Sequence, residues 1–335
     1  MSKQEDVFGK RIFIVSENDA GRRIDRYLAL RLSSFSRTLI QSLIRDGRVT
    51  IDGAPCKSNA LISGHQVIVF SLALPSNFDI KGEPIDLDIL YEDEHIIAVC
   101  KPAGLVAHPA PGHFEGTLVN ALIHHCDSLS DISGQLRAGI VHRLDKDTSG
   151  VMVMAKTNLA HESLALQFRE RTLQKEYVAI TEGEFRFDAD TIDLPLGRHF
   201  RDRKKIAVLF GGGKESVSRY QVKERFDGFT FVEVAPKTGR THQIRVHLKS
   251  LGNPVICDGY YGKRRRIRLA DIVPKEQAGT IPWEELKTVL MNRQGLHAHR
   301  LQFTHPASGK EMELHAPYPD DFNCVLDALR KWRKK

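Results

Sequence analysis

The chain has 335 residues, of which 41% are hydrophobic, and this predicts a globular protein of one to three domains. Its 49 Lys and Arg residues outnumber its 42 acids, a basic excess that permits a nucleic-acid partner without requiring one. No run of 18 apolar residues occurs and the five cysteines are not paired in spacing. We therefore expect a cytoplasmic protein with no membrane-spanning helix and no disulfide framework.

The N-terminal part predicts a small basic domain. Apolar residues at helical spacing predict amphipathic helices over residues 20–32 and 36–45, and short strands follow near 48–53 and 65–70. Residues 10–50 hold nine Lys or Arg and four acids, a local net charge of +5. This excess is typical either of a solvated helix surface or of a module whose arginines bind RNA phosphates.

The rest of the chain predicts a mixed sheet flanked by helices. Its strands occur both in hairpins and beside helices, which favours an α+β fold with a mixed, largely antiparallel sheet. Helices are expected at 116–126, 158–170, 241–252 and the C-terminus, and strands at 95–102, 138–144, 150–157, 175–181, 216–226, 229–237, 297–305 and 311–317. Residues 263–294 begin with KRRRIR and predict an inserted surface segment, suited equally to phosphate contact and to solvation.

Sequence motifs give no support to a metal or nucleotide cofactor. DKDTSG at 145–150 resembles the start of a calcium-binding loop, but Lys156 stands where a bidentate Glu is needed. FGGGKE at 210–215 lacks the Ser or Thr that a phosphate-binding loop requires after Gly-Lys, so it predicts a flexible hairpin turn. No Gly-x-Ser-x-Gly, Gly-x-Gly-x-x-Gly or His-Glu-x-x-His motif occurs. We therefore expect no cofactor and no metal.

The stretch VHRLDKDTSGVMVM, residues 141–154, places a carboxylate where a predicted strand breaks into a turn. If Arg143 to Asp145 are extended, their side chains point to one face and Leu144 points to the other. A carboxylate held near a guanidinium stays ionised and can act as a nucleophile or a base. The alternative is an Asp that caps the turn and is ion-paired for structure alone.

Two further segments, KTGRTHQIRVH (237–247) and KEYVAI, hold the other candidate residues. Thr241 is expected to cap a helix and to share a face with Arg245, while Arg240 lies in the preceding loop. Arg245 could reach an acid elsewhere in the chain, or the segment is a basic helix end. Tyr177 is either a functional aromatic or a half-buried residue of the core.

Four segments in this order resemble the RluA-type family of RNA pseudouridine synthases: KPAGLVAHP (101–109), HRLDKDTSGVMVMAK (142–156), KEYVA (175–179) and GRTHQIRVH (239–247). The stretch SRTLIQSLIRDGRVTIDG resembles the S4 RNA-binding domain that many members carry. The resemblance covers nearly the whole chain from about residue 10. It implies an S4-like domain at 10–75, a linker at 76–90, and a catalytic domain at 91–335 that contains the insertion at 263–294.

The resemblance also implies roles for individual residues. Asp145 matches the catalytic aspartate, and Arg143 matches an arginine that fills the space left by a flipped base. Tyr177 matches the tyrosine that stacks on the uracil, and Arg245 matches the arginine paired with the catalytic carboxylate. Candidate RNA contacts are Arg37, Arg45, Arg48 and Arg240. The segment DGYYG at 258–262 has Gly where the family often has Pro, a departure that affects a loop.

The implied reaction is the isomerisation of uridine to pseudouridine, an intramolecular transfer that requires no redox cofactor, nucleotide or metal. The arrangement is most similar to the branch that acts on large-subunit (23S) ribosomal RNA, the RluD- and RluC-type enzymes, and more to the RluD type. The expected partner is that RNA, free or in the assembling 50S subunit, and we expect a monomer that does not contact membranes. One rival is a non-catalytic RNA-binding or ribosome assembly protein. The other is a nucleoside hydrolase, which usually needs a second carboxylate, for which Asp147 is the nearest candidate.

Overall fold

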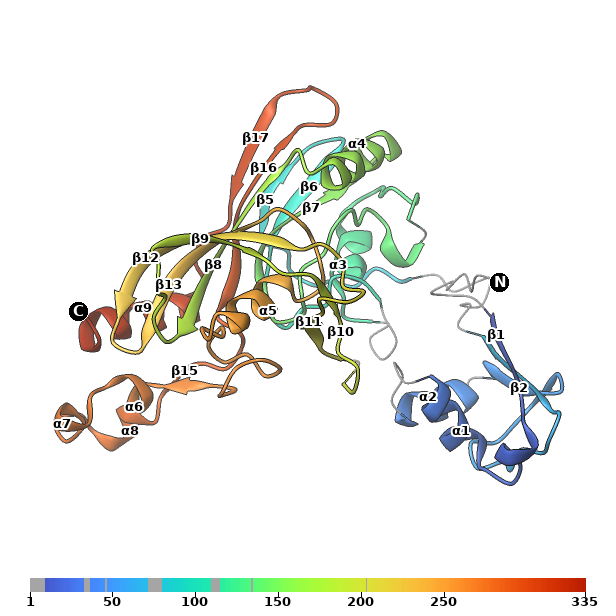
Figure 1. Ribbon diagram of the computed structural model, residues 1–335. Coiled ribbons are helices and arrows are strands. Elements are labelled where there is room, and N and C mark those ends of the chain that lie inside the picture. The colour runs from blue at the N-terminus through green and yellow to red at the C-terminus, as the bar shows by residue number, and fades with distance from the viewer. Residues whose placement is uncertain are drawn as a thin grey trace. The chain divides into compact units, whose positions relative to one another are not determined.

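The computed structural model describes residues 10–32, 37–45, 47–71, 80–109, 115–133, 135–202 and 204–335. The chain divides into two compact units, the first within residues 1–80 and the second comprising 81–109 and 115–335 (Figure 1). In these described ranges, no helix is long and apolar enough to cross a membrane.

The first unit is a small antiparallel sheet with two helices. The strands have the order β1-β4-β2-β3, and side chains from both helices, such as Tyr27 and Ile40, form its buried core. The two helices predicted for this region are confirmed. The elements are β1 (Lys10–Ile14), α1 (Ile24–Arg31), α2 (Arg37–Arg45), β2 (Val49–Ile51), β3 (Ala54–Pro55) and β4 (Val67–Ser71).

The second unit is built on a nine-stranded sheet of the order β5-β6-β7-β16-β8-β13-β12-β9, with β17 paired to β16. Within the described residues β7 and β16 are parallel and the other neighbours are antiparallel, which confirms the predicted mixed, largely antiparallel sheet. Its strands are β5 (Ile89–Glu92), β6 (Ile96–Lys101), β7 (Ser149–Ala155), β8 (Gln174–Glu182), β9 (Ala189–Asp193), β12 (Val217–Phe226), β13 (Phe229–Pro236), β16 (Leu296–Thr304) and β17 (Glu311–His315).

Helices cover this sheet, and two small strand pairs extend from it (Figure 1). Helix α4 packs on β7, and α5 packs on β12 and β13. The main helices are α3 (Leu118–His125), α4 (Asn158–Glu170), α5 (Gln243–Ser250) and α9 (Asp320–Trp332). The strand pairs are β10 (Leu196–Arg198) with β11 (Ile206–Val208), and β14 (Ile267–Arg268) with β15 (Val289–Met291).

The segment 263–294 carries its own buried side chains. Between β14 and β15 lie three short helices, α6 (Leu269–Ile272), α7 (Lys275–Ala278) and α8 (Trp283–Leu286). Ile272 and Met291 join one hydrophobic cluster with Phe322 and Leu329 of α9. Part of the segment is therefore buried against α9, although other parts of it are exposed. That the segment is an insertion stays a prediction.

Two expectations near the candidate site are wrong. Residues 138–144 form a turn, a bend and irregular chain instead of a strand, with a single bridge between Ile140 and Met154. The reason is that His142 turns inward, stacks on Phe168 at 4.5 Å between ring centroids, and accepts the N–H of Val153.

The second error concerns the start of α5. His242, not Thr241, is the residue before the helix, and its backbone is left-handed with φ 55°. Thr241 is exposed and outside the helix. The side chain of Gln243 accepts hydrogen bonds from Thr238 Oγ1 and from the N–H of Arg240, at 2.7 and 3.0 Å. These bonds fold the loop back onto the first turn, so Thr241 is not in a position to cap it.

Candidate active site

Asp145 lies in a loop between the bend at 141–142 and strand β7, and a buried lysine binds the backbone of that loop. The ammonium of Lys101 is fully buried and donates to the carbonyls of Pro102, Leu105 and Lys146, at 2.7, 3.0 and 3.1 Å. Burial lowers the pKa of Lys101 to about 8, against the opposing effect of nearby acids. Because all three N–H donors are satisfied, the lysine fixes the backbone next to Asp145 at neutral pH.

Strand β16 holds the other side of the same loop. Gly150 has φ 122° and approaches β16 so closely that a Cβ atom there would collide with the carbonyl oxygen of Ala298. Beside it, the fully buried His297 has its Nδ1 2.9 Å from Ser149 Oγ and its Nε2 3.2 Å from the carbonyl of Ala316. A carbonyl can only accept, so Nε2 carries the proton and Nδ1 accepts from the serine hydroxyl.

The carboxylate of Asp145 shares one guanidinium with a second carboxylate. Arg245 on α5 donates to Asp145 Oδ2 at 2.7 Å and to both oxygens of Asp258 at 2.7 and 2.8 Å. The side chains of Arg245 and Asp258 are 4% and 0% exposed, whereas that of Asp145 is 20% exposed. Asp258 therefore anchors the arginine in the interior, and Asp145 is the member of the trio that solvent and a substrate can reach.

The charges of this trio are mutually stabilising. Burial disfavours the charged form of Arg245, but the hydrogen bonds and charge of Asp258 outweigh it and raise the pKa of the guanidinium. Burial likewise raises the pKa of Asp258, but Arg245 and the N–H groups of Tyr260 and Tyr261 outweigh it and lower that pKa overall. Both groups therefore remain ionised at neutral pH.

A histidine forms a second contact to the same oxygen of Asp145. His242 Nε2 lies 3.8 Å from Asp145 Oδ2, and its Nδ1 lies 2.8 Å from the hydroxyl of Tyr261. That hydroxyl accepts the N–H of Ile206 at 2.7 Å, so its own proton is free to go to Nδ1 and the imidazole proton then faces Asp145. Burial lowers the pKa of His242, which keeps the ring neutral despite the charge of Asp145.

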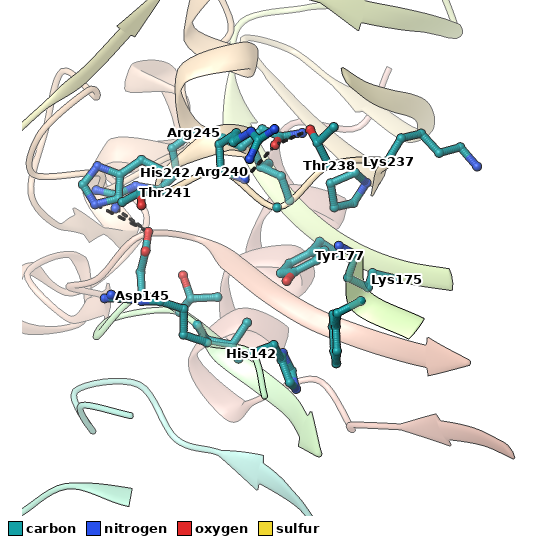
Figure 2. Close-up of a pocket in the computed structure, with 18 of the residues that line it drawn as sticks. His142, Asp145, Lys175, Tyr177, Lys237, Thr238, Arg240, Thr241, His242 and Arg245 are labelled. Atoms are coloured by element: carbon teal, nitrogen blue, oxygen red, sulfur yellow. Dashed lines mark hydrogen bonds and ion pairs between the residues drawn. The ribbon is translucent and has the colours of Figure 1, made fainter. Parts of the chain in front are cut away.

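These residues open into a cleft of about 500 Å³, a size typical of small-molecule sites. Figure 2 shows Asp145 facing Arg245 and His242, while Tyr177 and Lys175 lie together further along the cleft, opposite the loop that carries Thr238. Burial, followed by the charge of Asp145, raises the pKa of Tyr177, so the phenol stays neutral. Among the lining residues Asp145 is the one carboxylate, and the cations are Arg143, Arg169, Arg171, Lys175, Lys237, Arg240 and Arg245.

The structure brings together the predicted residues Asp145, Arg143, Tyr177, Arg245 and Arg240, all of which line this cleft. Arg143 is exposed there, and within the described residues the guanidinium paired with Asp145 is that of Arg245, one hundred positions along the chain.

The other predicted arginines lie in the first unit. Arg37 donates twice to the buried Asp25, at 3.0 and 2.8 Å, and the guanidinium side chain is 43% exposed. Arg45 is exposed at the end of α2, and Arg48 is half-buried. Their contact with RNA stays a prediction.

Sequence reasoning missed four residues of the site: Lys101, His242, Asp258 and Tyr261. Lys101 and Asp258 each stood in a segment that was noted, KPAGLVAHP and DGYYG, so a signal for them existed. Lys101 at the end of an apolar strand and Asp258 in a glycine-rich turn are single charged residues, and the sequence around them did not indicate which groups they bind. In the described part of the chain no cluster of three or more His, Cys, Asp or Glu could hold a metal ion.

Comparison with known proteins defines the class to which this fold and cleft belong. The family described as RNA pseudouridylate synthase matches residues 95–250, and the S4 domain matches residues 22–68. The uncharacterized RNA pseudouridine synthase YlyB of Bacillus subtilis is 42% identical over 316 residues, 94% of this chain and 97% of the relative. Ribosomal large subunit pseudouridine synthase D of Pseudomonas aeruginosa is 42% identical over 314 residues, 94% of each chain. The structure of Human RNA Pseudouridylate Synthase Domain Containing 4 is 26% identical, with a TM-score of 0.54, and covers 72% of this chain and 92% of that one.

The chain therefore belongs to the RluA-type RNA pseudouridine synthases that carry an N-terminal S4 domain. It is an enzyme of that class, and its substrate is RNA. The family, the fold class and the enzymatic activity predicted from the sequence are confirmed.

Proposed function

We propose that the protein isomerises specific uridines of 23S (large-subunit) ribosomal RNA to pseudouridine, with Asp145 as the catalytic carboxylate. The observation that carries this proposal is the ion pair between Asp145 and Arg245 in a cleft whose other charged lining residues are all cationic. A cleft with this charge attracts a polyanion and presents one carboxylate to it.

The reaction breaks the bond between C1′ of the ribose and N1 of the uracil, joins C5 to C1′, and replaces the proton lost from C5 with one gained at N1. Asp145 would act on the sugar or the base as a nucleophile or a base. Arg245 and His242 both approach Oδ2, so Oδ1 is the oxygen that we assign to the substrate. Because Asp258 and Lys101 hold the arginine and the loop, little reorganisation is required when the substrate binds.

The target uridine must leave its stack before it can reach Asp145, at a cost of roughly a few kcal/mol. Stacking on the ring of Tyr177 would return about 1–3 kcal/mol. Arg143, exposed on the same cleft, would occupy the vacancy in the RNA. Arg240 would bind the backbone nearby, since its Nε donates to the carbonyl of Glu215 at 3.1 Å and leaves other N–H groups available.

The large-subunit substrate is supported by the relatives that bear that name. We propose that residues 10–75 form the RNA-binding domain, with Arg37, Arg45 and Arg48 at phosphates, and that the catalytic domain spans 91–335 after a linker at 76–90. The tritium-release assay, run with free RNA and with precursor 50S subunits, distinguishes between these two substrates.

The test uses unmodified 23S RNA with tritium at uridine C5, and follows tritium release in the presence of EDTA. Wild type should release tritium, Asp145→Asn should release none while it still binds RNA, and Asp147→Asn should behave as wild type. Asp147 is the matched control because it is an exposed carboxylate two residues away.

Three results would redirect the proposal. Release by Asp145→Asn at the wild-type rate would remove this residue from its role. Free uracil as product would indicate the hydrolase instead. Binding of RNA and of precursor 50S subunits without any tritium release would favour the assembly protein.

A further inference from the structure

Lys175 points into the cleft beside the proposed stacking residue. It precedes Tyr177 by two positions on β8, so the two side chains share one face of the strand, about 7 Å apart. Both line the cleft, and Figure 2 shows them together. A Cβ atom on Gly239 would lie 3.9 Å from Lys175 Nζ, which places the ammonium between β8 and the loop before α5.

This half-buried ammonium lies 6.0 Å from the centroid of the Phe168 ring, but it lacks the carbonyl or carboxylate partners that the buried cations of the site possess. Lys101 donates to three carbonyls and Arg245 to two carboxylates, but within the described residues no hydrogen bond or salt bridge is made by Lys175. Its neighbour Glu176 is on the opposite face of the strand and pairs with Arg300. A cation that is partly withdrawn from water and has no anionic partner is costly to the fold, and a bound anion would offset that cost.

Its surroundings contain no carboxylate to fill that role. The one acid of the cleft, Asp145, is already bound by Arg245, and the other charges are positive. Burial, followed by the positive charge of Arg171, lowers the pKa of Lys175 to about 8. Uracil and ribose are neutral, so the anion that a nucleotide brings to this place is a phosphate.

We propose that Lys175 binds a phosphate of the target nucleotide and forms a phosphate subsite at the Tyr177 end of the cleft. This inference rests on the proposed function, because it takes a uridine of an RNA strand as the occupant. The phosphate on the 5′ side and that on the 3′ side of the uridine share the same chemistry, and the experiment separates them.

The first experiment measures binding of uridine, uridine 5′-monophosphate and uridine 3′-monophosphate to the full chain by NMR titration. Lys175→Met should weaken binding of one monophosphate about tenfold, which is about 1.4 kcal/mol, and leave uridine unchanged. Lys175→Arg should retain the affinity at pH 7. The control is Lys249→Met, which removes an exposed lysine of α5 outside the cleft.

The second experiment measures RNA affinity against salt and pH. Lys175→Met should reduce the slope of log affinity against log salt by about 0.7, the value for one contact to a single strand. In wild type the affinity should fall as the pH rises through 8, since the ammonium is lost, and Lys175→Arg should abolish that fall. The RNA measurements also test whether Lys175 binds a phosphate if the mononucleotides bind too weakly to titrate.

A stability measurement separates this role from a structural one. Removal of an uncompensated charge should raise the urea midpoint of Lys175→Met at pH 7, whereas removal of a structural contact would lower it. Equal weakening of uridine and both monophosphates would mean that Lys175 contacts the base, and would overturn the proposal. So would a wild-type salt slope in Lys175→Met. If 23S RNA proves not to be the substrate, the mononucleotide result still stands or falls by itself.

Discussion

The substitution Asp258→Asn removes one charge from the trio and replaces one carboxylate oxygen with an NH₂ donor. Asp258 Oδ1 accepts three hydrogen bonds, from Arg245 and from the N–H groups of Tyr260 and Tyr261, whereas Oδ2 accepts one from Arg245 Nε at 2.7 Å. The amide oxygen of Asn will keep the position with three donors. Its NH₂ group then meets the Nε–H of Arg245, donor against donor, and the buried guanidinium loses its principal counter-charge.

Breaking a buried ion pair in this way costs about 3–5 kcal/mol. With a urea m-value of about 3 kcal/mol/M for a protein of this size, the midpoint should fall by about 1–2 M. Pseudouridine formation should fall at least tenfold under conditions where the variant is folded, because Arg245 is no longer held against Asp145. Urea unfolding followed by circular dichroism and tritium release measure the two effects.

The double variant Asp258→Asn with Arg245→Met separates stability from catalysis. It removes both buried charges and keeps the amide oxygen for the two tyrosine N–H groups, so it should be more stable than either single variant. It should nevertheless be inactive. A midpoint of Asp258→Asn within 0.2 M of wild type, on the order of experimental error, would refute the reasoning that this carboxylate anchors Arg245.

Three further outcomes are expected. Tyr261→Phe should lower the free energy of unfolding by about 1–3 kcal/mol, because the N–H of Ile206 loses its acceptor. It should also lower kcat about tenfold, because His242 is no longer held by the hydroxyl; an unchanged kcat would contradict this role of Tyr261. Gly150→Ala should lower the free energy of unfolding by about 3 kcal/mol, since its Cβ would collide with the carbonyl of Ala298; a wild-type urea midpoint would show that the backbone relaxes. The pKa of Asp25 is lowered to about 2, because hydrogen bonds from Gln41 and two arginines outweigh its burial. Its stabilisation of about 2 kcal/mol is therefore present above pH 4 and lost as the pH falls toward 2, and urea midpoints of Asp25→Asn and wild type should converge over that range.

Local patterns predicted those parts of the fold that local physics determines. The β12–β13 hairpin turns at Asp227 and Gly228, where alternating strands on both sides and a turn-forming pair made the prediction direct. Helix α4 was predicted over residues 158–170, the bounds that the structure has. The strand expected at 138–144 failed because the inward side chain of His142 finds its partners in β7 and α4, which no alternation of the segment itself reveals.

The candidate site was predictable only in part for the same reason. Alternation placed Arg143 beside Asp145, but the arginine that binds this carboxylate comes from α5, and the residue pattern alone gave it no partner. The pairing expected from the family resemblance is the one that is present. Asp258 was read as part of a loop, because the need for a second carboxylate becomes visible only when Arg245 is known to be buried.

Three buried or half-buried cations belong to the candidate site of Asp145, and their different partners suit them to different tasks. Lys101 is satisfied by carbonyls and Arg245 by carboxylates, so both hold Asp145 in place before any substrate arrives. Lys175 has neither kind of partner within the described residues, and under the proposal made above its half-buried charge should reduce the stability of the fold until a phosphate binds. A site that keeps a costly charge next to Tyr177 gives up stability in exchange for affinity. A bound phosphate should therefore stabilise the wild-type protein more than Lys175→Met.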